Sequence, residues 1–154
     1  MMLSLLRTPW RVKERPNGDR VLVFVSRFDA AGLRSSLRLM RYSPAIGRAA
    51  RTAPGCIGSA LLARPVKGAY YTVSYWQDEE SLKAFTRQRP HRAGVKALHA
   101  AGPVDGVLIS WWADATARRP KWSEVMRRAD ASARGRYAGP QPAAPGDAAP
   151  AAVA

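Results

Sequence analysis

The sequence predicts an α+β fold in which strands and helices follow in the order βαββαβ, with one further helix at the end. Four segments, at residues 21–28, 56–64, 69–76 and 104–112, are rich in the β-branched and aromatic residues that favour strands. The segments after the first and third strands carry apolar residues at helical spacing. Two split βαβ units in this order form a four-stranded antiparallel sheet with helices on one face, the ferredoxin-like arrangement.

The first strand, VLVFVSRF at residues 21–28, is apolar at both sets of alternating positions, which predicts that both of its faces are buried. We expect Asp29 to cap the helix that follows. The residues that mark this helix as amphipathic, at i, i+4 and i+7, are Leu33, Leu37 and Met40. Proline removes a helical hydrogen bond, so Pro44 is expected to interrupt the helix, and a second short helix is expected at residues 45–52.

The middle of the chain predicts two consecutive strands joined by a tight turn. A proline–glycine pair ends the preceding helix, and the strands at residues 56–64 and 69–76 follow it. The turn between them ends in Gly68, which suits a positive φ. Cys56 lies in the apolar stretch GCIGSALL, so we expect a buried and unreactive thiol.

The stretch YWQDEESLKAF changes from strand to helix character between Trp76 and Asp78. Period-two alternation ends at Trp76, and Asp78 is expected to cap the next helix. Glu79 and Glu80 in the first turn complement the positive end of the helix dipole. The apolar stripe of this helix consists of Leu82 and Phe85.

The last part of the predicted domain contains a helix, a strand and a terminal helix. The helix spans residues 90–101, with a proline at an early position where it is tolerated, and Gly102-Pro103 ends it. The residues that share one of its faces are His91, Val95 and Leu98. After the fourth strand, KWSEVMRRAD predicts a short helix capped by Ser123.

Composition divides the chain into three parts. Residues 1–20 are irregular in sequence and are broken by two prolines, an asparagine and a glycine. Residues 21–130 form the predicted α+β domain. Residues 131–154 are rich in alanine, proline and glycine and have almost no large apolar side chains, so we expect them to be disordered.

The formal net charge of +14 is compatible with nucleic acid, anionic lipid or acidic small molecules as partners, but a general coding bias explains the many arginines equally well. We therefore do not expect a nucleic-acid partner. No apolar run reaches about 18 residues, so we expect no membrane span and no membrane partner. The start, MMLSLLRTPW, makes a poor signal peptide, and we expect a cytoplasmic protein.

The strands are apolar on both faces, although the helices of this fold cover only one of them. An exposed apolar sheet face indicates a partner surface. The sequence therefore predicts a homodimer that packs sheet to sheet.

The third strand carries the strongest chemical signal. Alternation places Tyr70, Thr72, Ser74 and Trp76 on one face, while the other face carries Ala69, Tyr71, Val73 and Tyr75. A cavity lined by such rings, hydroxyls and an indole N–H suits a planar aromatic ligand with polar edges. Filling of the core is the competing interpretation.

Histidine and cysteine limit the remaining chemistry. The two histidines, His91 and His99, lie eight residues apart and do not form the i, i+4 pair of a helical metal site. A single cysteine excludes a multi-cysteine metal site, and we expect no metal. His91 could act as a general base or a haem ligand, or it could pack in the interior with a hydrogen bond.

The stretch YYTVSYWQDEESLKAFTRQRPHRAG resembles the third strand and following helix of the antibiotic biosynthesis monooxygenase-like family, of the dimeric α+β barrel superfamily. FVSRFD and PGCIGSALLARP fit the pattern of its first and second strands, so the resemblance extends over residues 21–112. It implies a dimeric α+β barrel. The family includes cofactor-free oxygenases of polycyclic phenols and haem-degrading oxygenases.

The resemblance implies a site as well as a fold. Trp76 matches the strand-three tryptophan of several members, and His91 resembles the helix histidine that binds haem in the haem-degrading branch. The expected activity is a cofactor-independent monooxygenase reaction on an aromatic or polyketide-like molecule, in a cavity between sheet and helices, with His91 as base. The residues expected to bind or orient the substrate with Trp76 are Phe24, Arg27, Tyr71, Tyr75 and Trp111.

Three alternatives remain open. The protein could be a dimeric ligand-binding protein without turnover, or a haem-binding or haem-degrading protein that uses His91. It could also be an RNA-binding module, because RNA-recognition motifs share the βαββαβ order. In KGAYYTVSY only Tyr71 occupies one of the expected stacking positions.

Overall fold

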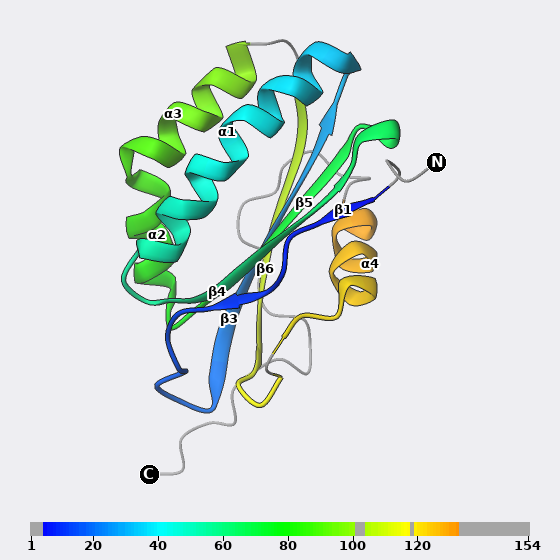
Figure 1. Ribbon diagram of the computed structural model, residues 1–154. Helices are drawn as coiled ribbons and strands as arrows, with labels where there is room; N and C mark the ends of the chain where they lie inside the picture. Colours follow the sequence, from blue (N-terminus) through cyan, green and yellow to red (C-terminus); the bar gives the residue numbers. More distant parts are fainter. Residues whose placement is uncertain (1–4, 101–103, 118, 133–154) are drawn as a thin grey trace.

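The computed structural model describes residues 5–100, 104–117 and 119–132. Its four long strands are β3 (Arg20–Ala30), β4 (Cys56–Arg64), β5 (Ala69–Trp76) and β6 (Val104–Asp114). They form an antiparallel sheet in the spatial order β4-β5-β3-β6 (Figure 1). This strand order and the βαββαβ sequence of elements confirm the predicted α+β, ferredoxin-like fold.

Helices lie on both faces of this sheet. The helix layer consists of α1 (Gly32–Thr52), α2 (Glu79–Arg87) and α3 (Arg89–Ala100) on one face. On the other face lies α4 (Trp122–Ser132), which Figure 1 shows in orange on the opposite side of the strands. We call the two sides the helix-layer face and the α4 face.

Register and alternation divide the strand residues between these two faces. Leu22 pairs with Trp76 on one side and with Trp112 on the other, and all three pack with apolar residues of the helix layer. The adjacent row, Val23 with Tyr75 and Trp111, packs with residues of α4. Both faces of the first long strand therefore pack against other elements, as the apolar residues at both sets of its alternating positions predicted.

The expected exposed sheet face is not present in the described chain. Val125, 1% exposed, and Ala129, 0% exposed, pack from α4 onto the α4 face, and the partly buried Trp122 and Trp10 add to the cover. Exposure of this face therefore gives no support to a homodimer, and the homodimer stays a prediction. The sequence signal was correct about two apolar faces, but the cover comes from the same chain.

α1 differs from its prediction in three respects. It is one helix that continues through Pro44, and the Ser43 hydroxyl donates to the carbonyl of Leu39 one turn earlier, at 2.6 Å. Its N-cap position is Ala31, without a side-chain hydrogen bond, because Asp29 still lies in β3 and pairs with Arg27. The apolar stripe is also exposed, and buried serines occupy the inner side of the helix.

The elements around β5 follow the prediction closely. Gly68 has a φ of 64° after the short 3₁₀ helix η1 (Pro65–Lys67), which confirms the left-handed turn. The Asp78 carboxylate accepts a hydrogen bond from the Ser81 backbone N–H at 2.7 Å and caps α2. Leu82 and Phe85 are buried beneath this helix, as predicted.

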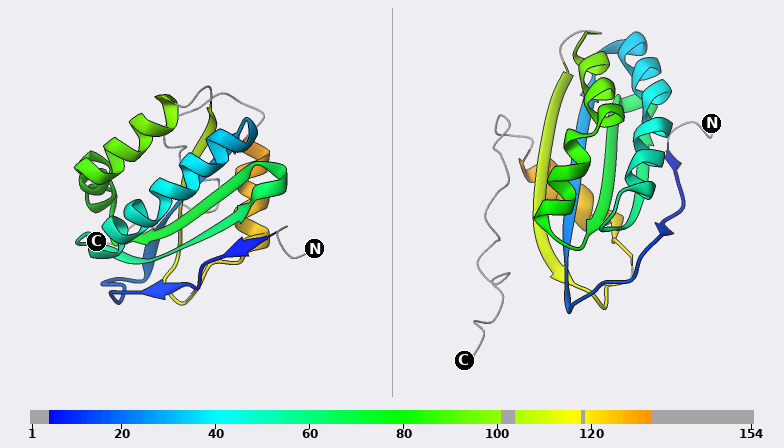
Figure 2. Two further views of the ribbon diagram at one scale, coloured as in Figure 1. Left: turned by 45° about the horizontal axis from the view of Figure 1, so that its top comes forward. Right: turned by 90° about the vertical axis from the view of Figure 1, so that its left-hand side faces the viewer.

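The N-terminal segment is part of the sheet rather than wholly irregular. Two short strands, β1 (Leu6–Arg7) and β2 (Arg11–Val12), pair antiparallel with the edge strand β4. The left-hand view of Figure 2 shows this segment running along the edge of the sheet. The predicted helix stop at Gly102-Pro103 and nearly all of the predicted disordered tail, from residue 133 on, lie outside the described residues.

Among the described helices, none is long and apolar enough to cross a membrane.

Candidate functional site

Trp76 lies in the interior beneath the helix layer. Its side chain is fully buried, and its indole Nε1 donates to the Ser74 hydroxyl at 2.8 Å. The Trp76 ring lies 5.2 Å from the Phe85 ring of α2, between centroids. The preceding residue, Tyr75, packs on the α4 side. Successive side chains of a strand point to opposite faces, so the Trp76 ring points towards the helix layer.

His91 completes this aromatic cluster from the first turn of α3. Its ring lies 5.0 Å from the Phe85 ring in an edge-on arrangement, so Phe85 stands between His91 and Trp76. The Nδ1 atom lies 3.1 Å from the carbonyl oxygen of Thr86. A carbonyl can only accept a hydrogen bond, so we assign the proton of the neutral ring to Nδ1 and a lone pair to Nε2.

The electrostatics of His91 favour this neutral form. Burial lowers the pKa of His91 below its ordinary value of 6.5, and the hydrogen bond to the Thr86 carbonyl opposes that shift in part. The imidazole is therefore mainly uncharged at pH 7, with Nε2 able to accept a proton.

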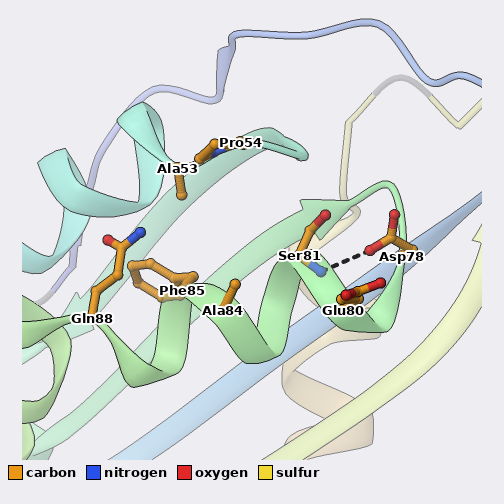
Figure 3. Close-up of a pocket in the computed structure, with 8 residues that line it drawn as sticks. All are labelled: Ala53, Pro54, Asp78, Glu80, Ser81, Ala84, Phe85 and Gln88. Carbon is orange, nitrogen blue, oxygen red and sulfur yellow. Dashed lines mark hydrogen bonds between the residues drawn. The ribbon is translucent and has the colours of Figure 1, made fainter.

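A surface hollow adjoins this cluster. It has a volume of about 210 Å³ and lies between the end of α1 and the side of α2 that faces it (Figure 3). The residues that line it are Ala53, Pro54, Asp78, Glu80, Ser81, Ala84, Phe85 and Gln88. Phe85 lines this hollow and also contacts the rings of Trp76 and His91, but neither Trp76 nor His91 is among the residues that line it.

The helix-layer face also carries short hydroxyl side chains in the middle of the sheet. Ser26 of β3 and Thr72 of β5 share a hydrogen bond, and Ser74 is the next residue on that face of β5. Ser35 and Ser36 of α1 are buried, at 3% and 8% exposure. Serine and threonine at alternate positions of otherwise apolar strands were the signal in the sequence for this polar layer.

Tyr70 adds an unusual polar atom to the same face. Its side chain is 2% exposed, and its hydroxyl has no hydrogen-bond partner among the described residues. Such an atom carries a desolvation cost that a bound ligand or water could relieve. It lies on the same face of β5 as Trp76, six residues earlier along the strand.

The structure divides the sequence-predicted site residues between the two faces of the sheet. Trp76, Phe24 and His91 lie on the helix-layer side, where Phe24 packs against the cluster that contains Trp76. The residues on the α4 face are Arg27, Tyr71, Tyr75 and Trp111. The sheet separates these two groups, so they do not line one common cavity.

The residues of the α4 face have partners of their own. Arg27 forms salt bridges with Asp29 at 2.9 Å and with Asp130 at 2.6 Å. The Tyr71 hydroxyl donates to the same Asp130 carboxylate at 2.9 Å. Burial and this hydrogen bond raise the pKa of Tyr71, while Arg27 opposes the shift. These contacts attach the end of α4 to the sheet.

Tyr75 and Trp111 also have contacts on the α4 face. Burial raises the pKa of Tyr75 to about 12, and Trp10 packs edge-on against it at 4.8 Å. The guanidinium of Arg128 lies 4.5 Å from the centre of the Trp111 ring. Tyr71, only 2% exposed, is not available to stack on a base, which removes the ring that supported an RNA-binding module.

Haem does not fit beside His91 in this arrangement. The ring of His91 packs on Phe85, which is 5% exposed, and Trp76 is 0% exposed behind it. The adjoining hollow of about 210 Å³ is below the roughly 300–1,000 Å³ of ordinary small-molecule sites. Among the described residues, no group of three or more His, Cys, Asp or Glu side chains could hold a metal ion.

Cys56 is buried and forms no disulfide in the described chain, as the apolar sequence around it predicted. Burial raises its thiol pKa to about 11, so the reactive thiolate is scarce at neutral pH.

A comparison with protein families bears directly on this arrangement. Residues 41–97 match the antibiotic biosynthesis monooxygenase family. The match confirms the resemblance that the sequence indicated. It covers less than half of the chain, from the middle of α1 to α3, and includes Trp76, Phe85 and His91. None of the curated proteins matches the chain.

The chain is similar to several solved structures at low sequence identity. A candidate monooxygenase from Fusobacterium nucleatum is 9% identical and has a TM-score of 0.54, with 63% of this chain and 45% of that chain covered. Rv0793 from Mycobacterium tuberculosis is 13% identical and has a TM-score of 0.50, with 57% and 91% covered. SnoaB, a cofactor-independent oxygenase from Streptomyces nogalater, is 22% identical, with a TM-score of 0.48 and coverage of 59% and 91%.

Proposed function

We propose that the protein is a monooxygenase that oxidises an electron-rich aromatic molecule with dioxygen, without a bound cofactor. The observation that carries the proposal is the environment of His91: its hydrogen bond, its ring packing and its lowered pKa. Burial lowers the pKa of His91 and so favours its neutral form, its Nδ1 lies 3.1 Å from the Thr86 carbonyl oxygen, and its ring packs on Phe85, which in turn packs on Trp76. The match of residues 41–97 to the antibiotic biosynthesis monooxygenase family supports the reaction class.

The proposed chemistry balances with dioxygen as the only oxidant. His91 Nε2 accepts the proton of a phenol, and the resulting anion transfers one electron to dioxygen. The two radicals combine at a ring carbon to form a peroxide anion, and the His91 imidazolium returns its proton to it. The resulting hydroperoxide loses water to leave a carbonyl, and His91 is neutral again. For 1-naphthol, one molecule and one dioxygen give one 1,4-naphthoquinone and one water. The protein supplies the base and the position of the ring.

The aromatic cluster and the hollow limit the size of the substrate. Phe85 lines the hollow, so an aromatic ligand bound there would contact its side chain. Because the volume of about 210 Å³ is below the usual range, the hollow as it stands admits a small ring system. We therefore expect phenols and naphthols to react before larger polycyclic compounds.

Oxygen uptake with 1-naphthol tests this function. We expect one dioxygen consumed per quinone formed, and a loss of about 100-fold or more in kcat for His91→Asn, since a general base contributes about that much. The matched control is His99→Asn, at the only other histidine, which should keep the wild-type rate. An unchanged rate in H91N would remove His91 from the mechanism.

A second candidate function follows from the burial of the cluster. Trp76 and Phe85 are almost completely buried, as in a filled core, which also suits a protein that binds a small aromatic ligand near Phe85 without turnover. Quenching of tryptophan fluorescence by naphthol, with no oxygen uptake by wild type, would favour this binding function over the monooxygenase.

A further inference from the structure

α1 exposes the apolar side chains that its sequence would be expected to bury. Leu33 is 76% exposed, Leu37 58% and Met40 44%, and their i, i+4, i+7 spacing places them along one side of the helix. Ser35 and Ser36 are buried instead. An amphipathic helix ordinarily turns its apolar stripe towards the core. We call Leu33, Leu37 and Met40 the α1 stripe.

A row of arginines runs beside the α1 stripe. Arg34, Arg38 and Arg41 each follow a stripe residue by one position, so they form a parallel row with the same spacing, and all three are exposed. The helix also contains Arg48 and Arg51 but no aspartate or glutamate. α1 therefore presents an apolar row and a cationic row side by side.

The positive charge continues onto the neighbouring helices of the same layer. A hollow of about 390 Å³ at the α2–α3 junction is lined by Arg87, Arg89, Arg92, Ala93 and Lys96. Within the described part of the chain, none of these four cations forms a salt bridge. α3 has no acidic residue. The right-hand view of Figure 2 looks onto this helix layer, with α2 and α3 beside α1.

We propose that the outer surface of the helix layer docks on an anionic lipid membrane. Helices that lie on membranes combine an exposed apolar row with arginines or lysines, because the apolar side chains enter the headgroup boundary and the cations attract anionic lipids. The proposal stands independently of the monooxygenase function. The sequence prediction of no membrane partner rested on the lack of a span, which binding at the surface does not require.

Charge and exposure disfavour a nucleic acid or a second copy of the chain as the partner of this surface. Phosphate contacts to a nucleic acid would use the arginines but would leave Leu33, Leu37 and Met40 in water. A second copy packed symmetrically through α1 would bring the two arginine rows together, and like charges repel. A fluid anionic surface satisfies both rows at once.

Vesicle co-sedimentation tests the proposal. We expect wild-type protein to pellet with phosphatidylcholine vesicles that contain about one third phosphatidylglycerol, and to pellet weakly with phosphatidylcholine alone. Raising the salt from about 50 mM to about 500 mM should release much of it, because the charges are then screened.

Two triple variants measure separately what the arginine row and the α1 stripe contribute to vesicle binding. R34Q/R38Q/R41Q should lower the affinity for anionic vesicles about 100-fold, at roughly fivefold for each arginine near the surface. L33S/L37S/M40S should lower it at least about tenfold, since the apolar side chains no longer enter the headgroup boundary. The matched controls are R7Q/R11Q/K67Q and Val66→Ser, at exposed positions outside the helix layer, and both should bind within about twofold of wild type.

Three results would overturn the proposal, provided that circular dichroism shows every variant folded. The first is no binding to anionic vesicles at about 50 mM salt, where charge attraction is strong. The second is wild-type affinity in L33S/L37S/M40S, which would mean adsorption by net charge alone. The third is a wild-type dimer that the same variant dissociates, which would identify a second copy as the occupant.

Discussion

Alternation along β5 places Trp76 and Tyr75 on opposite faces of the sheet, and this decides what each ring can do. Trp76 contacts Phe85 and lies in the layer that contains His91. Tyr75 faces Trp10 and the α4 side. The period-two pattern separated these two sets in the sequence, but it could not say which set faces the helices that carry His91, because both sets contain aromatic rings.

At the same scale, His91 makes the stability of the protein depend on pH. Its folded-state pKa is lowered by burial, so the unfolded chain binds the proton more readily. The contribution of the buried, neutral His91 to the free energy of unfolding is complete above the unfolded pKa of 6.5. It is lost as the pH falls through that value towards the lower folded-state pKa. Acidification from pH 8 to about pH 5 should therefore destabilise wild type more than His91→Asn.

Urea unfolding of wild type, His91→Asn and His99→Asn at several pH values measures this difference. We expect the wild-type and H99N midpoints to fall together on acidification, and the H91N midpoint to fall less steeply. Parallel profiles for all three proteins would show that the burial of His91 has no energetic consequence.

Among the elements, α1 and α4 show what local patterns could not decide. The spacing of Leu33, Leu37 and Met40 predicts a helix, but it does not say which side faces the core, and the helix turns Ser35 and Ser36 inwards. The sequence predicts the α4 segment as a helix, and the structure confirms it. Its position on the α4 face depends on contacts between residues that are far apart in the sequence, and a local pattern cannot predict such contacts. By contrast, β5 and α2 followed their turn and cap residues closely.

The packing of α4 gives a prediction at this scale. Val125 is 1% exposed beneath the helix, so Val125→Ala should lower the free energy of unfolding by about 2 kcal/mol through lost apolar burial and the space it leaves. Arg127→Ala on the same helix is exposed and should change it by less than about 0.5 kcal/mol. Equal effects in urea unfolding would mean that α4 is not docked on the sheet.

For the whole molecule, the sequence was sufficient for the order of the elements and the sheet topology, but it missed how the N-terminal segment joins the domain. The predicted domain began at residue 21. In the structure β1 and β2 pair with the edge strand β4, and Trp10 packs on Tyr75. Strands of two residues carry no periodicity to detect, and their pairing with β4 connects positions about fifty residues apart.

This connection leads to a prediction about the limits of the folding unit. A chain that starts at Glu14 lacks β1, β2 and Trp10, and it leaves Tyr75 and the β4 edge exposed. We expect its free energy of unfolding to fall by about 2–4 kcal/mol, as for the loss of a large, partly buried ring with its neighbours. We also expect self-association, because unpaired strand edges recruit other strands.

A chain that starts at Leu5 keeps every described contact of the segment and is the matched control. Urea unfolding and light scattering measure both effects, and a Glu14 chain as stable and as monodisperse as the Leu5 chain would place the limit of the folding unit at the long strands.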